Sequence, residues 1–394
     1  MDKDSIVILG PTRTAQGNLL GELKDFTAPQ LGAAVIKAAV ERAGLKAEDI
    51  EEVLMGCVLP AGQGQAPARQ AALAAGLPVT TGCTTLNKMC GSGMKAVMLA
   101  HDILRTGQHK FIVAGGMESM SNGPYLLPKA RQGYRLGHGQ LFDHTLLDGL
   151  EDAYDKGRPM GYFAERCAQE FGFSREEQDR YTLTSFERAR KAIQEQYFAA
   201  EIIALTAKTR EGEKRIDTDE RPGSVSLEKI SQLKPAFDKD GTVTAGNSSS
   251  ISDGAAAFVL TRFSEAEKRG LRPIARLLAH SASAKAPEQF TTAPIDATRL
   301  LLEKIGWTVA ETDLFEINEA FAVVAMAAMR ELHIPHDKIN IRGGGCALGH
   351  PIGATGARII VTLVHALQQQ QLKRGIASLC IGGGEATAVA VELL

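Results

Sequence analysis

An internal duplication constrains the fold of this chain more than any other feature. The segment 90–118 begins Cys-Gly-Ser-Gly, continues with apolar residues at helical spacing, and ends in a β-rich run followed by Gly-Gly. The segment 350–385 begins His-Pro-Ile-Gly and repeats that order, and upstream the run 51–56 parallels 312–318. Periods of 20–50 residues, which indicate a solenoid, are absent, so the repeat indicates a duplication into two related α/β halves.

The length of 394 residues predicts more than one packed unit, because a single hydrophobic core usually stops growing at about 250–300 residues. We expect an N-terminal half over 1–118 plus 245–269, an inserted loop domain over 119–244 and a C-terminal half over 270–394. Short β-rich runs alternate with longer amphipathic stretches, which predicts an α/β protein with a mostly parallel sheet.

The inserted segment is polar and rich in loops, and insertions of this length usually shape a binding site or an oligomer contact. Within it we predict a helix over 175–198, with Ser174 as its N-cap ahead of Glu176 and Glu177. The runs 242–244 and 255–260 are interpreted as the return of the chain to the first half.

Composition excludes several classes of function. Lys plus Arg number 44 and Asp plus Glu 46, a formal net charge of −2, so we expect no nucleic-acid partner. The apolar run 6–9 is too short for a secretory signal, and no stretch reaches the roughly 18 apolar residues that span a bilayer. The six cysteines have no paired spacing, which favours reduced thiols in a cytoplasmic protein without a membrane partner.

Four residues are candidates for chemistry because of their places in the repeat. Cys90 lies where a loop meets a helix, and the amides there favour a thiolate with a lowered pKa. His350 holds the equivalent place in the second half. Cys380 ends an apolar strand before three glycines, and Asn318 follows the strand-like run 314–317.

Each of these residues taken alone has a plain structural explanation: core packing for the cysteines and the histidine, and a helix cap for Asn318. Together they are more informative, because ligands in open α/β sheets bind at strand ends. Two thiols, an imidazole and a carboxamide suit a two-step acyl transfer. Zinc is the other chemistry open to Cys90, Cys380 and His350, but their separations lack the short pairs typical of zinc sites, so we expect no metal.

The sequence resembles the thiolase family over nearly its whole length. The motifs that carry the resemblance are Asn-Lys-Met-Cys-Gly-Ser-Gly at 87–93, Gly-Gly-Met-Glu-Ser-Met-Ser at 115–121, Pro-Ala-Phe-Asp at 235–238, Thr-Val-Thr-Ala-Gly-Asn at 242–247, Asn-Glu-Ala-Phe-Ala at 318–322, Gly-His-Pro-Ile-Gly at 349–353 and Cys-Ile-Gly-Gly-Gly at 380–384. The resemblance implies a duplicated five-layer αβαβα fold with two pseudo-symmetric halves and an inserted loop domain.

The resemblance also implies a role for each matched residue. Cys90 would be the nucleophile that forms the acyl-enzyme, and His350 would activate it. Cys380 would be the acid/base at the α-carbon of the second acyl-CoA, while Asn318 would hold a water beside the enolate oxygen. The backbone N–H groups of Cys90 and Gly382 would form the oxyanion hole, and losing one such donor costs on the order of 100-fold or more.

Coenzyme A enters the implied reaction as substrate and product, with no permanently bound cofactor. Ser249 aligns with a serine that contacts CoA, and Arg221 is a weaker candidate for the CoA phosphates because its spacing to Pro235 does not match cleanly. Family members are commonly homodimers or homotetramers, and the resemblance assigns the tetramer contact to the loops at 119–150.

Four departures from the family pattern concern the substrate. Pro159 stands where short-chain acetoacetyl-CoA thiolases carry a histidine, and Phe290 begins a segment that replaces Met-Gly-x-Gly-Pro. Glu385 follows the glycine run where Met is usual. It would raise the pKa of Cys380 if it faced inward, although we expect it to face solvent. Arg342 stands where the biosynthetic enzymes have asparagine.

The first expectation is an acetyl-CoA C-acetyltransferase that condenses two acetyl-CoA molecules or runs in reverse. Pro159 and Phe290 favour the alternative, a degradative 3-ketoacyl-CoA thiolase that accepts longer chains. A catalytically idle CoA-binding protein is disfavoured because all four catalytic positions are filled. A ketosynthase on the same duplicated fold is disfavoured by Cys380, since that subgroup has two histidines, or histidine and asparagine, opposite its cysteine.

Overall fold

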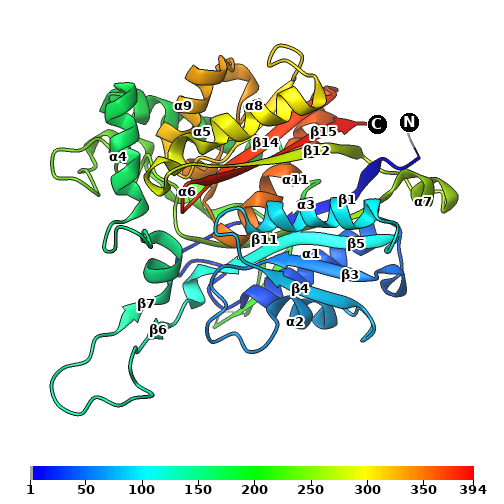
Figure 1. Ribbon diagram of the computed structural model, residues 1–394, viewed down its shortest axis with the longest axis horizontal. Helices are drawn as coiled ribbons and strands as arrows, with labels where there is room; N and C mark the ends of the chain where they lie inside the picture. Colours follow the sequence, from blue (N-terminus) through cyan, green and yellow to red (C-terminus); the bar gives the residue numbers. More distant parts are fainter. Residues whose placement is uncertain (1–2, 211) are drawn as a thin grey trace.

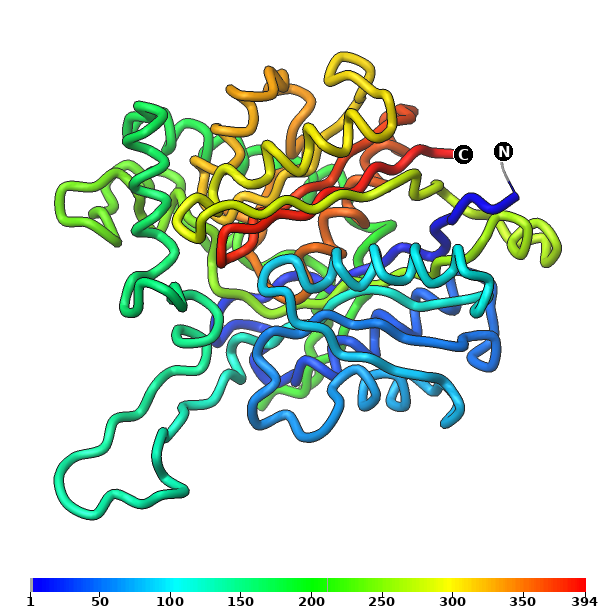
Figure 2. Tube along the Cα trace, viewed as in Figure 1, coloured from blue at the N-terminus to red at the C-terminus, as the bar shows by residue number. Residues whose placement is uncertain are grey.

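The computed structural model describes residues 3–210 and 212–394. Its helices and strands stack in five layers, with a layer of helices outside each of two sheet layers and a third helical layer between them (Figure 1). The tube in Figure 2 shows the blue and cyan first half on one side and the orange and red second half on the other. The five-layer α/β fold expected from the resemblance is confirmed.

The first half is built on five strands of the main sheet path and three helices, with the short helix α7 (Phe263–Lys268) after the last strand. The strands are β1 (Ile6–Thr14), β3 (Glu52–Gly56), β4 (Gly82–Leu86), β5 (Phe111–Ser119) and β11 (Ser252–Arg262), and the helices are α1 (Ala28–Arg42), α2 (Pro67–Ala74) and α3 (Ser92–Arg105). The strands lie in the order β4-β3-β5-β11-β1. Helices α1 and α2 cover the outer face of this sheet, where apolar residues of both elements form one core cluster.

The second half repeats this arrangement with one strand fewer. Its strands are β12 (Ala275–Ala284), β13 (Leu314–Ile317), β14 (Arg374–Ile381) and β15 (Glu385–Leu393), and its helices are α8 (Ala293–Ile305), α9 (Ala322–Leu332), α10 (Gly345–Leu348) and α11 (Ile352–Gln370). The order β13-β14-β15-β12 matches β3-β5-β11-β1. Three residue pairs between β1 and β12 join the two halves into one continuous 11-stranded sheet.

The expectation of a mostly parallel sheet is wrong. Along the main path of the described sheet, β13 with β14, β3 with β5 and β3 with β4 pair in parallel, and the five other neighbouring pairs are antiparallel. The reason is visible at β14 and β15, which are joined by Gly382, Gly383 and Gly384. Such a short connection can join only antiparallel strands, and Gly383 and Gly384 adopt positive φ angles of 93° and 89° that glycine tolerates.

Helices α3 and α11 form the central layer. Every residue of α11 from Ile352 to Leu367 is buried, as expected for a helix with protein on all sides. A Cβ at Gly356 would lie 2.4 Å from the Met94 backbone nitrogen, and one at Gly93 would lie 3.0 Å from the Ala357 nitrogen. These glycines let the two helices touch backbone to backbone, so that their starting turns lie together.

The inserted segment contains small hairpins and two long helices along one end of the molecule. Its elements are β6 (Tyr125–Leu126), β7 (Phe142–Asp143), α4 (Met160–Phe171), α5 (Arg175–Gln194), β9 (Leu205–Thr209), β10 (Gly212–Ile216) and α6 (Glu220–Ser224). The loop between β6 and β7 projects away from the body (Figure 1). Helix α5 begins with the predicted cap: Ser174 accepts from the Glu177 amide, and the Glu177 carboxylate accepts from the Ser174 amide.

The return of the chain to the first half occurs at β11, between β1 and β5, and not at 242–244 as interpreted from the sequence. Residues 242–244 form only an isolated bridge between Thr244 and Pro235, and Val243 packs into the core cluster of the second half. Among the described residues, no helix combines the length and apolarity needed to cross a bilayer.

Candidate active site

Cys90 is presented by a tight turn between β4 and α3. Met89 adopts a positive φ of 46°, which is uncommon for a residue with a side chain. Ser92 closes this turn, because its hydroxyl accepts from the Lys88 amide at 2.8 Å and donates to the Met89 carbonyl at 2.6 Å. The turn leaves Cys90 partly exposed, two residues before the first residue of α3.

His350 occupies the equivalent position two residues before α11, and its hydrogen bonds define its tautomer. The Thr355 hydroxyl donates to the Pro351 carbonyl at 3.0 Å, so its oxygen accepts from Nδ1 of His350 at 2.7 Å. Nε2 therefore carries the free lone pair, and it has no partner within the described residues although the ring is buried. Burial, and secondarily Arg358, lower the pKa of His350 to about 3, so the ring is a neutral base.

Although Cys90 as a whole is partly exposed, its thiol is surrounded by protein. This burial raises the pKa of the Cys90 thiol to about 11, while the backbone N–H groups of Gly382 and of Cys90 itself lower it. The expected net lowering of this pKa is therefore wrong. The amides at the helix start act in the expected direction, but the loss of water outweighs them. The same contacts bring the N–H of Gly382 to the sulfur of Cys90, across the boundary between the two halves.

Cys380 lies at the end of β14 and is buried. Burial raises the pKa of its thiol well above the ordinary value, and the charge of a Cys90 thiolate raises it further. The two sulfurs are thus close enough that ionising one disfavours ionising the other. Cys380 is suited to hold its proton until a strong base, such as an enolate carbon, takes it.

Asn318 follows β13 directly and is buried, with its backbone N–H donating to the Ser378 carbonyl at 3.0 Å. Its side chain is not a helix cap, because α9 begins at Ala322 with Phe321 in the cap position. Neither the side-chain oxygen nor the nitrogen of Asn318 has a hydrogen-bond partner among the described residues. A buried, unpaired amide is costly, which is consistent with an amide that binds a water or a ligand.

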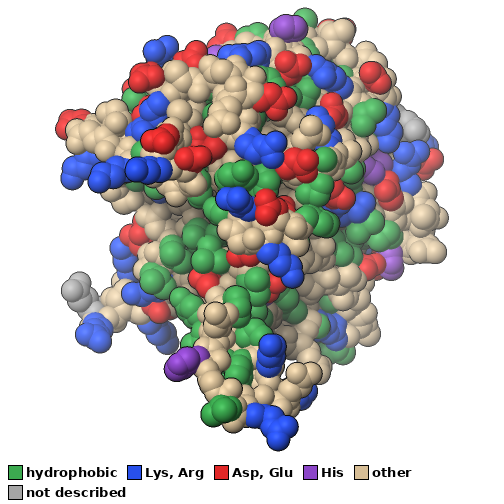
Figure 3. Space-filling view, turned by 60° about the vertical axis from the view of Figure 1, so that its left-hand side comes forward, with side chains coloured by type: hydrophobic (Ala, Val, Ile, Leu, Met, Phe, Trp, Pro, Cys, Tyr) green, Lys and Arg blue, Asp and Glu red, His purple; other side chains and the backbone are tan. Residues whose placement is uncertain are grey.

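One pocket of about 540 Å³ gathers the sequence-predicted residues. Cys90, His350, Cys380 and Gly382 line it, together with both candidates for coenzyme A contacts, Ser249 and Arg221; Asn318 is the exception, since it does not contribute to the lining. Figure 3 shows hydrophobic side chains gathered on the face from which the β6–β7 loop projects, with Lys and Arg around them. An apolar cavity with a few convergent polar groups is the usual form of a substrate site.

The two candidates for coenzyme A contacts differ in their hydrogen bonds: the side chain of Arg221 is bonded to the protein, whereas Ser249 is bonded through its backbone. Arg221 donates from Nε to the Cys346 carbonyl at 2.8 Å and from a terminal nitrogen to the Ala245 carbonyl at 3.2 Å. Burial lowers its pKa below the ordinary arginine value. The backbone N–H of Ser249 donates to the Ala320 carbonyl at 3.0 Å. The position of its hydroxyl is therefore set by a fixed backbone.

Aromatic rings form one wall of the pocket. Phe290 is buried and packs edge-on against Phe163 and Phe321, with ring centroids 6.4 and 6.5 Å apart. Pro159 caps α4 and lines the same cavity. Arg342 lies elsewhere, stacked over the Tyr197 ring at 3.7 Å.

Glu385 does not face Cys380. Its carboxylate forms an ion pair with Lys88, two residues before Cys90 in the other half, and both side chains are partly exposed. The expectation that Glu385 faces solvent is thus only partly correct, because the carboxylate is at the surface but paired.

Glu118 is a site residue that sequence reasoning did not single out. It is fully buried, and its carboxylate accepts from the amides of Val58, Leu59 and Gly353 at 2.9, 3.2 and 2.8 Å. Burial raises its pKa to about 7 against the opposing effect of those amides. It ties the loop after β3 to the first turn of α11. The signals in the sequence were its place at the end of a glycine-containing apolar strand and inside the family motif at 115–121, but neither indicated which amides it binds.

Comparison with known proteins agrees with this geometry. Residues 6–264 match the family model "Thiolase, N-terminal domain" and residues 271–393 match "Thiolase, C-terminal domain". The acetyl-CoA acetyltransferase of Chromobacterium violaceum is 48% identical over 389 residues, covering 98% of this chain and 99% of the relative. That of Escherichia coli is 48% identical over 390 residues, with 98% and 99% covered.

A solved structure gives the same result. The crystal structure of the Bacillus anthracis acetyl-CoA acetyltransferase superposes with a TM-score of 0.96 at 41% identity, covering 99% of both chains. Sequence and fold therefore agree over the whole length and in both halves, and the chain belongs to the thiolase family.

Proposed function

We propose that this chain is an acetyl-CoA C-acetyltransferase, which joins two acetyl-CoA molecules into acetoacetyl-CoA and free CoA and also catalyses the reverse cleavage. The observation that carries the proposal is the meeting of Cys90, Cys380, His350 and the Gly382 N–H in one apolar pocket. Relatives that align over the full chain are named acetyl-CoA acetyltransferases.

In the cleavage direction, Nε2 of His350 takes the proton of the Cys90 thiol as the sulfur attacks the 3-keto carbon of acetoacetyl-CoA. The free lone pair on Nε2 and the proton resting on Cys90 are the starting states this step needs. The N–H groups of Cys90 and Gly382 donate to the oxyanion, and each is fixed by the backbone before the substrate arrives.

Carbon–carbon cleavage then leaves an acetyl group on Cys90 and an enolate of acetyl-CoA. Cys380 gives its proton to the enolate carbon, a step that suits a thiol with a raised pKa. A water held by the unpaired Asn318 amide stabilises the enolate oxygen together with His350. Free CoA passes its thiol proton to the Cys380 thiolate and takes the acetyl group. The imidazolium of His350 returns a proton to Cys90, which closes the cycle.

For coenzyme A, we assign Ser249 and Arg221 to the approach to the pocket. Both line it, and the Arg221 guanidinium keeps its positive charge at neutral pH despite burial, because arginine starts from so high a pKa. CoA is substrate and product here, and no other cofactor takes part in the steps above.

The acyl side supports a short chain. Phe290, which on the sequence alone favoured longer chains, lies in a packed aromatic wall of the pocket with Phe321 and Phe237, and the last two rings are in edge contact at 5.9 Å. This filled wall instead favours a short acyl group. The alternative of a broad-chain degradative thiolase gains no support from the relatives, which carry the acetyl-CoA acetyltransferase name.

The division into halves of 1–118 plus 245–269 and 270–394 around an insertion of 119–244, assembly as a homodimer or homotetramer, and a cytoplasmic location are further parts of this proposal. Assembly is supported by exposed apolar side chains on the projecting loop, which are Tyr125, Leu127, Leu136, Leu141 and Phe142. Light scattering on the purified protein, beside a variant with Leu136 and Leu141 changed to Ser, tests the loop's part in assembly.

The activity is tested by CoA-dependent cleavage of acetoacetyl-CoA, 3-ketohexanoyl-CoA and 3-ketooctanoyl-CoA, with Cys90→Ala as the blank. A clear preference for acetoacetyl-CoA is expected. Faster turnover of the longer substrates would move the protein to the degradative group. Turnover that persists in Cys90→Ala would remove the acyl-enzyme mechanism altogether.

A further inference from the structure

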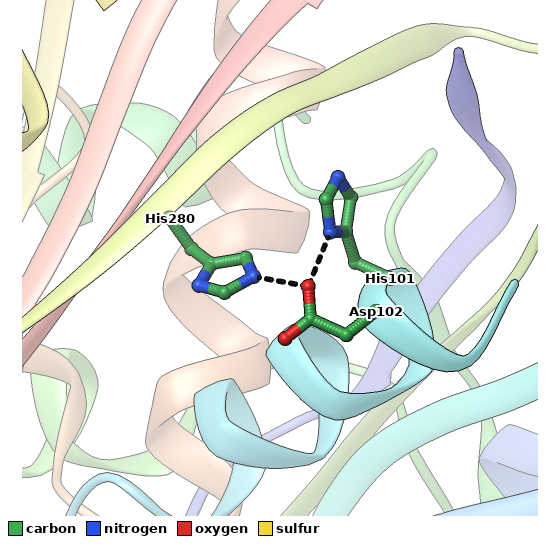
Figure 4. Close-up of side chains that lie close together, drawn as sticks. All are labelled: His101, Asp102 and His280. Atoms are coloured by element: carbon green, nitrogen blue, oxygen red, sulfur yellow. Dashed lines mark hydrogen bonds and ion pairs between the residues drawn. The ribbon is translucent and has the colours of Figure 1, made fainter. Parts of the chain in front are cut away.

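A cluster of two imidazoles and one carboxylate lies at the boundary between the two halves (Figure 4). His101 and Asp102 are on α3, and His280 is on β12. One oxygen of Asp102, Oδ1, lies 3.0 Å from Nδ1 of His101 and 2.9 Å from Nε2 of His280. The two rings stand at 90° with centroids 5.1 Å apart. Three potential ligand atoms thus lie within 4.8 Å of one another.

We propose that His101, Asp102 and His280 bind one divalent transition-metal ion of the Zn²⁺ type, which ties α3 of the first half to β12 of the second. Zinc bonds of about 2.0–2.1 Å place tetrahedral ligand atoms about 3.3 Å apart. The two observed distances to Asp102, 2.9 and 3.0 Å, need to open by only a few tenths of an ångström. The third distance, between Nδ1 of His101 and Nε2 of His280, lies within 4.8 Å and has to adjust to about the same value. The expectation of no metal concerned only the catalytic cysteines and histidine, not this cluster.

Binding requires no oxidant and no net proton release. An ionised carboxylate only accepts hydrogen bonds, so each ring nitrogen beside Asp102 now carries a hydrogen. On binding, that hydrogen moves to the other nitrogen of the same ring, and metal–nitrogen bonds form to Nδ1 of His101 and Nε2 of His280. Both imidazoles remain neutral, and the single negative charge of Asp102 offsets half the charge of the ion.

One positively charged side chain lies near the cluster. Arg105, one turn along α3, opposes a cation, which limits the affinity without closing the site.

The cluster is open on one side. The side chain of Asp102 is 54% exposed, whereas those of His101 and His280 are 5% and 14% exposed. An ion can therefore enter from solvent and keep a water as its fourth ligand. Two imidazoles with one carboxylate suit Zn²⁺ and its neighbours and are poor ligands for Mg²⁺ or Ca²⁺, which prefer oxygen.

The ion would act on stability and not on catalysis. His101 lies nine residues into α3 from Ser92, about 14 Å along the axis at 1.5 Å per residue. Because the ligands come from both halves, an ion that binds only the folded protein stabilises their contact by mass action.

The proposal is tested by titrating ZnCl₂ into chelator-treated full-length protein, using calorimetry and thermal unfolding. One ion per chain and a rise in Tm are expected, and MgCl₂ should produce neither. His280→Gln and Asp102→Asn should each weaken Zn²⁺ binding at least about tenfold, as loss of a ligand does. His109→Gln is the matched control, because His109 pairs with Glu51 and Glu52 but has no second imidazole beside it.

The cysteines of the active site must be separated from this cluster. The same titration is therefore run after alkylation of Cys90, and with Co²⁺, whose thiolate complexes show a strong charge-transfer band. Zn²⁺ binding that survives alkylation, without that band, supports the cluster. A thiolate band that accounts for all the bound ion, unchanged Zn²⁺ binding in a folded His280→Gln variant, or no binding at about 1 mM Zn²⁺ would overturn the proposal.

Discussion

The two helix starts of the central layer occupy equivalent positions in the duplicated fold, yet they hold opposite kinds of group. Cys90 precedes α3 through a turn with positive φ at Met89, is partly exposed, and has the N–H of Gly382 beside its sulfur. His350 precedes α11, is buried, and has its Nδ1 tied to Thr355. In the proposed mechanism, one half thus supplies a proton donor that becomes a nucleophile, and the other supplies the base.

This difference shows that the repeat determines position but not chemistry. The amides at a helix start favour negative charge and disfavour positive charge. At His350 burial acts in the same direction and lowers the pKa to about 3, so the ring is neutral at any higher pH. At Cys90 burial acts against the amides and raises the pKa to about 11, so the thiol keeps its proton at any lower pH. The pair therefore rests uncharged until a substrate draws the proton across.

Of the changes at the two helix starts, removal of the proposed nucleophile should have the largest effect on activity. Cys90→Ala should lower kcat for acetoacetyl-CoA cleavage by at least about 10⁴-fold, because no acyl-enzyme can form. Cys83→Ala is the matched control: Cys83 is a partly exposed thiol on β4, and its loss should leave kcat unchanged. Equal effects of the two changes would count against a nucleophilic Cys90.

Alkylation reports the protonation of Cys90 directly. With a pKa of about 11, its thiolate fraction rises tenfold per pH unit at neutral and mildly alkaline pH. The rate of Cys90 modification by iodoacetamide should therefore climb by about 10³-fold between about pH 7 and pH 10. A rate that levels off near neutral pH would instead mean that the helix start dominates, as the sequence alone led us to expect.

Removal of the proposed base at the second helix start should also lower the activity. His350→Asn should lower kcat by about 10²- to 10⁴-fold, the usual contribution of general acid–base catalysis. His365→Asn is the control, since this buried histidine on the same helix bonds only the Pro11 carbonyl. Both variants are compared by thermal unfolding, so that a loss of fold is not read as a loss of chemistry. Normal turnover in His350→Asn would show that Cys90 is activated by another group.

A subtler change tests the tautomer. In Thr355→Val the Nδ1–H of His350 loses its acceptor, and the ring is free to place the hydrogen on Nε2 instead. We expect kcat to fall about tenfold or more, with little change in KM. Thr298→Val is matched, because Thr298 is also a buried helical threonine but its hydroxyl has no partner within the described residues. A KM effect without a kcat effect would assign Thr355 to binding.

The positions of Cys90 and His350 could be predicted from the sequence, because each depends on the local pattern of residues around it. The repeat placed Cys90 and His350 before helices and Cys380 at a strand end, and all three placements are confirmed. The Ser174 cap was predictable for the same reason, since it depends on residues three apart.

The features that depend on tertiary contact could not be predicted. Glu118 acquires its role only when β5 meets α11, and the net pKa of Cys90 depends on burial by both halves. Val243 reads as a strand residue, yet its neighbours come from the second half. Period and spacing carry no information about which distant surfaces exclude water.

The ion pair between Glu385 and Lys88 crosses the boundary between the two halves, and its removal should have the smallest effect on activity. Lys88 adjoins the turn that presents Cys90, and Glu385 follows the glycines that present the Gly382 N–H. We therefore expect their ion pair to help align the two N–H groups of the proposed oxyanion hole. Both side chains are partly exposed, and such pairs contribute only about 0–1 kcal/mol. Glu385→Gln should therefore lower kcat by about two- to fivefold.

Salt should reproduce that loss in the unmodified protein, because it screens exposed charges. The control is Glu392→Gln at the other end of β15, where the carboxylate pairs with Arg276 and Arg374 far along the strand from Gly382. A cycle with Lys88→Met decides the mechanism. If the double variant is no slower than either single variant, the pair acts as one unit. If the losses multiply, the two residues act separately and the two halves are aligned by their glycine contacts alone.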